Sequence, residues 1–186
     1  MEITSEETIG YPMEQVWLVM RDHLPELAQF LSGAESIEVE EREELGPGRL
    51  RLLNIWQGSG EKVPKAIRPF LSKNIMRLKD HAIWDESRKQ VSWRFETFHF
   101  NKLFDCAGET RFSSTSNQHT RIVIRGELKI YPDRVPGVPR FLAKKIGPTI
   151  ERFVVDLVGS NMREISGSIQ KFLDRRQGVC SPEKNV

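Results

Sequence analysis

The side chains best suited to acid-base or nucleophilic chemistry are four histidines and two cysteines, scattered along the chain. The sequence contains no nucleophile elbow, no His-Glu-x-x-His zinc motif and no glycine-rich phosphate loop. We therefore predict no established catalytic set, no metal site and no cofactor. His99 is the single catalytic candidate, because it continues an alternating face with Trp93 and Phe95. The alternative is a buried histidine that is hydrogen-bonded to the backbone.

The two cysteines do not form a recognisable disulfide or metal-binding pattern. Cys106 falls on the apolar side of its segment with Phe104 and Phe112, so we expect a core filler rather than a nucleophile. Cys180 lies in a polar stretch near the end of the chain. The sequence shows neither a secretory leader nor a run of 18 apolar residues. We expect a reducing, cytoplasmic location.

Charged residues alternate along several segments and allow two interpretations. One is a site with paired carboxylates, and the other is a ladder of ion pairs between strands on a solvated face. We predict the ladder. Its members are Arg94, Glu96, Glu109, Arg111, Arg121, Arg125 and Glu127.

Residues 147–173 have the periodicity of a long amphipathic helix. Ile150, Val154, Leu157, Ile165 and Phe172 fall in one sector at about 100° per residue. Asn161 and Ser168 lie at the centre of this apolar stripe. Buried polar groups need partners, so each side chain either bonds to backbone or water, or lines a cavity and orients a ligand. We separately predict a short helical turn over 140–146.

Everything upstream of this helix is dominated by strand patterns. We expect a first strand at 2–9, two short helices before Gly33, and then a run of antiparallel strands. The apolar face of such a sheet must be buried, and only the last helix is long enough to cover it. The sequence therefore predicts an α+β fold, with a curved antiparallel sheet of about six to seven strands around the C-terminal helix. The predicted strands after the helices are 37–44, 49–56, 75–85, 90–100, 104–114 and 120–131.

This order of elements, together with the segment Thr8-Ile9-Gly10-Tyr11-Pro12-Met13-Glu14-Gln15-Val16-Trp17, resembles the START-like superfamily. That group includes the birch pollen allergen, START lipid-transfer domains and polyketide cyclases. The resemblance covers residues 1–176 as one domain and leaves 177–186 as a flexible polar tail. It implies a helix-grip fold with a hydrophobic cavity between sheet and helix. The superfamily shares no universal catalytic residues, so the resemblance assigns none here.

The function expected from this resemblance is binding of a lipid, quinone or polyketide-like molecule. The first alternative is a cyclase, aromatase or hydrolase in which His99 acts with Thr97, Asn54 or Asn161. The second is a co-chaperone-like interaction module, which would expose an apolar patch. The predicted ligand-binding residues are Asn54, Trp56, Trp93, Phe95, Thr97, His99, Phe104, Cys106, Phe112, Ile124, Leu128, Leu157, Asn161 and Ser168.

Charge distribution adds a prediction about partners. The net charge of +2 argues against a general nucleic-acid-binding protein.

In an antiparallel meander, the connections 57–73, 99–103 and 132–147 lie at one end of the sheet, and they mix basic with apolar residues. We expect this end to be the mouth of the cavity. Residues 57–73 and 132–147 could also dock transiently on an anionic membrane. Alternatively, the apolar residues simply plug this end.

Overall fold

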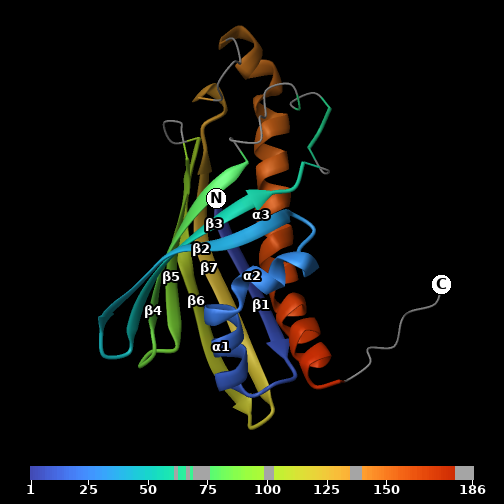
Figure 1. The fold of residues 1–186 in the computed structure, drawn as a ribbon. Helices are drawn as coiled ribbons and strands as arrows, with labels where there is room; N and C mark the ends of the chain where they lie inside the picture. The colour runs from blue at the N-terminus through green and yellow to red at the C-terminus, as the bar shows by residue number, and fades with distance from the viewer. Residues whose placement is uncertain (61–62, 66–67, 69–75, 99–102, 135–139, 179–186) are drawn as a thin grey trace, which may run out of the picture.

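The computed structural model spans the chain and describes all residues except 61–62, 66–67, 69–75, 99–102, 135–139 and 179–186 (Figure 1). Within the described part, seven strands precede one long helix. The strands are β1 (Glu2–Ile9), β2 (Ala34–Gly46), β3 (Arg49–Gly58), β4 (Arg77–Asp85), β5 (Gln90–Thr97), β6 (Phe104–Ser116) and β7 (His119–Ile130). The α-helices are α1 (Met13–Asp22), α2 (Leu24–Leu27) and α3 (Arg140–Arg176), and the short 3-10 helices are η1 (Ala28–Phe30) and η3 (Pro132–Arg134).

The strands form one antiparallel sheet in the order β1-β7-β6-β5-β4-β3-β2. From β2 to β7, each strand pairs with its neighbour in sequence, and β1 closes the row against β7. The predicted α+β fold with two short helices after the first strand is confirmed, and the seven strands observed agree with the predicted six to seven. The hairpin turns between β2 and β3 and between β4 and β5 meet at one end, where the Glu86 backbone N–H donates to the Gly48 carbonyl at 2.8 Å.

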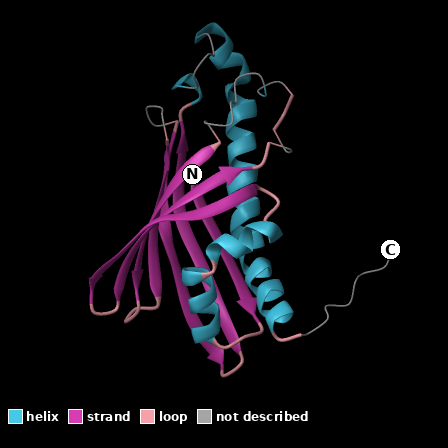
Figure 2. Cartoon of the chain, viewed as in Figure 1, coloured by secondary structure: helices cyan, strands magenta, loops and turns pink. Residues whose placement is uncertain are grey.

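The sheet is strongly curved, and the helices lie against its concave side (Figures 1 and 2). Helix α3 runs the length of the sheet, with β1 and β7 beside its C-terminal half. Helices α1 and α2 pack near that same half. A sheet with one apolar face needs such a cover, because the face would otherwise remain in water.

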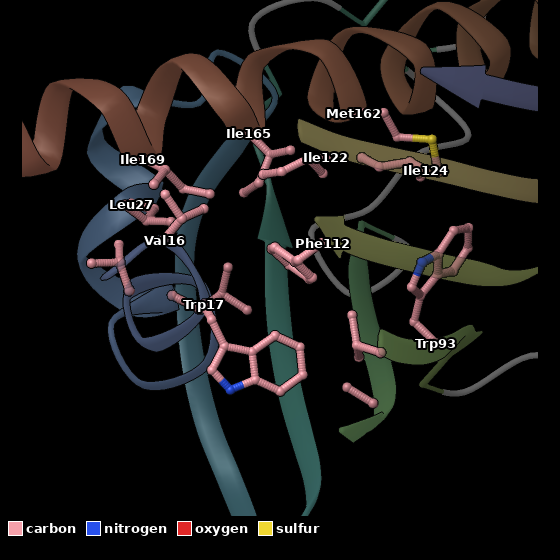
Figure 3. Packing of buried hydrophobic residues seen from close by; sticks show 14 of the residues in the cluster. Val16, Trp17, Leu27, Trp93, Phe112, Ile122, Ile124, Met162, Ile165 and Ile169 are labelled. Atoms are coloured by element: carbon pink, nitrogen blue, oxygen red, sulfur yellow. The ribbon is translucent and has the colours of Figure 1, made fainter. Parts of the chain in front are cut away.

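The main core lies where α1, α2 and the C-terminal half of α3 meet the sheet. In Figure 3, Ile165 and Ile169 of α3 approach residues from the other layers, including Val16 of α1 and Ile122 of β7. Trp17 packs edge-on against Trp84 and Phe112, with ring centroids 4.9 and 5.2 Å apart. Burial of each large apolar side chain contributes about 1.5–3 kcal/mol.

Hydrogen bonds also attach the C-terminal half of α3 to the N-terminal part of the chain. The Tyr11 hydroxyl donates to Asp174 Oδ1 at 2.7 Å, and the Gly10 N–H donates to Gln170 Oε1 at 2.9 Å. Nearer the middle of the helix, the Ser32 N–H donates to Glu164 Oε2 at 2.7 Å. The C-terminal half of α3 is therefore held by both apolar packing and polar contacts.

The prediction that a separate turn over 140–146 precedes a helix starting at 147 is wrong. Helix α3 is continuous from Arg140, with Pro148 inside it. Proline removes one helical hydrogen bond, and its ring crowds the carbonyl four residues earlier. On either side of it, Ile146 and Ile150 are both buried in one apolar cluster with Val63 and Leu103. Packing on both sides of Pro148 holds the helix together across the proline.

The outer face of the sheet is charged and solvated, as predicted. Arg111 pairs with Glu109 at 2.8 Å, and Arg121 pairs with Glu6 across strands at 2.7 Å. The Arg94–Glu96 pair, like the Arg111–Glu109 pair, runs along a single strand. The ion pairs therefore run along strands as well as between them. Exposed pairs of this kind contribute about 0–1 kcal/mol each.

Candidate functional site

A cavity of about 220 Å³ lies between the inner face of the sheet and the N-terminal half of α3. Its walls come mainly from β3 to β7 and from α3. Met20 of α1 and Leu24 of α2 close it toward the main core. The lining is predominantly apolar and aromatic, as is typical of small-molecule sites.

Helix α3 changes character where it passes this cavity. Ile150 is buried, and so are Met162, Ile165 and Ile169, but no residue from Glu151 to Asn161 is. Leu157 and Val158 in this stretch line the cavity and are only half-buried. The inner side of α3 is therefore packed at its C-terminal half and faces open space in the middle.

The floor of the cavity is a row of residues that runs across the sheet. Asn54 of β3 pairs with Asp80 of β4, Asp80 with Phe95 of β5, and Phe95 with Cys106 of β6. Alternation along each strand points these residues to the same face. A polar pair on β3 and β4 thus continues into an apolar row on β5 and β6.

Asp80 is the most unusual residue of this row. It is 6% exposed, and its Oδ2 accepts hydrogen bonds from Asn54 Nδ2 at 3.0 Å and from Trp56 Nε1 at 3.4 Å. Burial raises the pKa of Asp80 to about 6, although these two hydrogen bonds act in the opposite direction. A carboxyl group with a pKa near neutrality exchanges protons readily at physiological pH.

Several polar atoms around the cavity have no hydrogen-bond partner among the described residues. They are Asn54 Oδ1, Asp80 Oδ1, Trp84 Nε1 and Asn161 Oδ1. All four residues line the cavity, and Asn161 approaches it from α3, opposite the sheet. Each buried, unpaired polar group carries a free-energy penalty of about 1–3 kcal/mol. A ligand that supplied partners would recover part of that penalty.

The remaining polar groups of the lining are inert or paired. Trp93 Nε1 donates to Thr110 Oγ1 at 3.1 Å, and Thr110 is 1% exposed. Burial raises the pKa of the Cys106 thiol to about 12, and the nearby charge of Asp80 adds to the shift. Cys106 is therefore a neutral wall residue, and its thiolate is not available as a nucleophile.

An apolar cluster lies where the cavity approaches the end of the sheet opposite the hairpin turns. It consists of Val63, Leu103, Ile146 and Ile150. Leu103 and Ile150 also line the cavity. The connections 57–73, 99–103 and 132–147 were predicted either to form the mouth of the cavity or to plug this end of the sheet with their apolar residues. The cluster agrees with the second alternative.

The structure separates the predicted ligand-binding residues into three groups. Phe112 and Leu128 are buried in the main core and do not line the cavity, and Ser168 bonds to backbone, donating to the Glu164 carbonyl at 2.7 Å. His99 lies outside the described residues. The predicted residues that line the cavity are Asn54, Trp56, Trp93, Phe95, Thr97, Phe104, Cys106, Ile124, Leu157 and Asn161.

Sequence reasoning did not propose Asp80, Trp84 and Thr110 as lining residues. The signal for Asp80 was present, because Leu78, Asp80, Ala82 and Trp84 alternate along β4 and share a face. An aspartate in phase with a tryptophan and an alanine indicates a buried polar group.

The fold has clear counterparts among solved structures. A Thermus thermophilus protein is 17% identical and aligns with a TM-score of 0.59 over 92% of this chain and 99% of that one. The Zhui aromatase/cyclase of a Streptomyces species is 15% identical and aligns with a TM-score of 0.58 over 93% of this chain and 95% of that one. Norcoclaurine synthase from Thalictrum flavum is 16% identical and aligns with a TM-score of 0.55 over 93% of this chain and 86% of that one. The chain therefore has a helix-grip fold, which these solved structures share.

The helix-grip fold was thus predictable from the sequence, although the identities are low. No family model matches the chain, and no curated protein matches it. Among the described residues, no helix is long and apolar enough to cross a membrane. The part of the chain that the structure describes also holds no cluster of three or more His, Cys, Asp or Glu side chains arranged for a metal ion.

Proposed function

We propose that this protein binds a small, mainly hydrophobic molecule in the cavity between the sheet and α3, and carries or presents it. The observation that carries the proposal is the open space beneath residues 151–161 of α3. An apolar helix face left without packing partners forfeits dispersion contacts that a ligand would restore.

The size of the cavity narrows the choice of ligand. Sites for drug-sized molecules usually measure roughly 300–1,000 Å³, whereas this one is about 220 Å³. Aromatic side chains line it, including Trp56, Trp93 and Phe95. A compact ligand with one or two rings, such as a quinone or a small polyketide-like molecule, suits these walls better than a long acyl chain.

Native mass spectrometry of protein purified gently from its own cells tests the proposal. We expect a small apolar molecule to remain bound. Val154→Trp fills the cavity from α3 and should abolish the bound mass, whereas Leu18→Trp, at an exposed position on α1, should leave it unchanged. The proposal fails if no molecule co-purifies and the empty protein also binds no added naphthalene.

A second candidate is an enzyme that uses the same cavity, and Asp80 is the observation that favours it. Ring closure between a carbonyl group and an activated carbon needs a base to take a proton from that carbon and an acid to protonate the resulting alkoxide. A buried carboxyl group with a pKa of about 6 can do both in turn. Asp80→Asn should then abolish turnover of a β-keto substrate while binding persists. Unchanged turnover in this variant would exclude Asp80 from the chemistry.

The interaction-module alternative has less support. The large hydrophobic side chains exposed in the described part of the chain are Met1 before β1, Leu18 of α1, Val39 and Leu45 of β2, and Ile83 of β4. Surface hydrophobic residues scattered in this way are ordinary. The cavity is the more specific feature.

Docking on an anionic membrane through 57–73 and 132–147 stays a prediction. Much of 57–73 lies outside the described residues, while Lys144 and Lys145 are exposed on the first turns of α3. Co-sedimentation with anionic vesicles at low salt tests this prediction. We expect binding that is lost when both lysines are changed to glutamate, and absence of binding by the unmodified protein would contradict docking.

A further inference from the structure

The cavity contains one ionisable carboxyl group and no basic group among its described lining residues. Asp80 is that carboxyl, and none of the described lining residues is Lys, Arg or His. A buried carboxylate is costly unless a cation pairs with it. The charge of Asp80 therefore lies in an apolar pocket without a cationic partner in the wall.

Two oxygens without a hydrogen-bond partner among the described residues belong to neighbouring residues at this point. Asn54 and Asp80 are paired across β3 and β4, and the amide nitrogen of Asn54 is used in its bond to the carboxylate. Asn54 Oδ1 and Asp80 Oδ1 remain, and both accept hydrogen bonds when Asp80 is ionised. Each oxygen exposes less than 1 Å². A ligand therefore reaches these oxygens only after a rotation about χ2, a torsion that is broad in Asn and Asp.

Aromatic rings continue the wall beside this pair. Trp56 and Phe95 have ring centroids 6.0 Å apart, and Phe95 and Trp93 have centroids 5.8 Å apart. All three line the cavity, and Trp56 also contacts Asp80 through its indole N–H. Aromatic faces attract cations as well as apolar groups.

We propose that the cavity selects a primary amine, whose ammonium group bridges Asp80 and Asn54 while its apolar body lies between the aromatic wall and α3. This inference rests on the proposed function, because it uses the same cavity, and it narrows the ligand class to hydrophobic amines.

An ammonium group satisfies this site better than the other common polar groups. Its three N–H donors can reach both unpaired oxygens, and its charge neutralises the carboxylate. An alcohol offers one donor and no charge. A carboxylic acid ligand would place a second negative charge beside Asp80, which is unfavourable at short range.

Isothermal titration with three ligands of similar shape tests the inference. Phenethylamine carries the ammonium, propylbenzene has no polar group, and hydrocinnamic acid carries a carboxylate. We expect phenethylamine to bind at least tenfold more tightly than propylbenzene at neutral pH, and hydrocinnamic acid to bind most weakly. In Asp80→Asn the advantage of phenethylamine should disappear while propylbenzene binding persists, which also shows that the variant is folded. Asp156→Asn, with the same change on the exposed side of α3, should behave as the unmodified protein does.

A pH series on the unmodified protein provides an independent measurement. Phenethylamine affinity should fall as pH drops below about 6, because protonation removes the charge of Asp80, while propylbenzene affinity stays flat. Among the described residues, the titratable groups that couple electrostatically to Asp80 are Cys106 on β6, which remains neutral here, and His81 on the outer face of β4, which pairs with Glu96. Lys79, the chain neighbour of Asp80, lies on the outer face as well.

The outcomes separate this inference from the function on which it rests. If propylbenzene binds and phenethylamine binds no more tightly, the amine inference is overturned and the hydrophobic site stands. The amine inference is likewise overturned if the preference for phenethylamine survives in Asp80→Asn. If neither ligand binds, both the proposed function and the amine inference fail.

Discussion

The indole ring of Trp93 occupies the space that a side chain at Gly126 would fill. A Cβ atom at Gly126 would lie 2.6 Å from Trp93 Cη2, and one at Gly108 would lie 2.6 Å from Trp93 Cζ2. The three residues form one row across β5, β6 and β7, since Trp93 pairs with Gly108 and Gly108 with Gly126. The two glycines thus let a large aromatic side chain lie close over the sheet at the floor of the cavity.

We expect Gly126→Ala to destabilise the protein by about 1–3 kcal/mol, because the added methyl group overpacks a closed site. Urea unfolding measures the change. Adding Trp93→Phe should recover part of the lost stability, since the smaller ring frees the space. Gly167→Ala is the control: nothing lies near a Cβ at that position in α3, so it should be neutral or stabilise by up to about 1 kcal/mol. A Cβ at Gly126 would also lie 2.8 Å from the Ala107 carbonyl oxygen, so a Gly126→Ala variant as stable as the unmodified protein would show that both Trp93 and this part of β6 move aside freely.

Alternation predicts which face of a strand a residue occupies, and this is why the sheet was predictable. It does not predict where along that face a cavity lies. All three of Ile124, Leu128 and Phe112 are buried on the same inner face, but only Ile124 lines the cavity. That difference depends on the curvature of the sheet and the path of α3, which no local pattern encodes.

Asn161 and Ser168, the two polar residues in the apolar stripe of α3, show the same limit of prediction from local sequence patterns. Ser168 bonds to the carbonyl four residues earlier, and Asn161 lines the cavity with Oδ1 unpaired. Sequence spacing gave them equivalent positions. Tertiary packing distinguishes them, since the C-terminal half of α3 is packed and its middle is not.

The pKa of Asp80 predicts an unusual pH dependence of stability. The pKa is about 6 in the folded protein, against an ordinary value of 3.8. Between about pH 4 and 6 the folded state holds more protons than the unfolded state, so this group lowers stability as pH rises through that window. A shift of this size corresponds to roughly 3 kcal/mol.

Urea unfolding of the unmodified protein and Asp80→Asn at a series of pH values isolates this effect. The stability of Asp80→Asn relative to the unmodified protein should rise from pH 4 to 6 and then level off. Carboxyl groups with lowered pKa values, such as those of Asp22 and Glu86, lose stabilising interactions in acid, but they contribute equally to both proteins and cancel. A difference that does not vary with pH would mean that Asp80 titrates normally.

Asn161 tests whether the polar interruption in the apolar stripe of α3 has a structural role. Its Oδ1 is unpaired, and its side chain lies so close to Gly33 that a Cβ there would be 2.3 Å from Oδ1. We expect Asn161→Leu to leave stability unchanged or raise it by about 1–2 kcal/mol, because it removes a buried unsatisfied group. Ligand affinity should fall in the same variant. A loss of several kcal/mol in thermal or urea unfolding would instead identify Asn161 as a structural hydrogen-bonding residue.

The apolar cluster of Val63, Leu103, Ile146 and Ile150 leads to a prediction about ligand exchange. Ile146 belongs to this cluster but does not line the cavity, so Ile146→Val loosens the end of the sheet and leaves the walls intact. We expect propylbenzene to enter and leave about two to ten times faster, with little change in affinity, as measured by NMR exchange. Ile169→Val is the matched control, because Ile169 is buried in the packed half of α3. Both substitutions should lower stability by about 0.5–1.5 kcal/mol. Faster exchange in Ile146→Val alone would place the entrance at this cluster, whereas equal acceleration in both variants would mean that the ligand enters through global loosening of the fold.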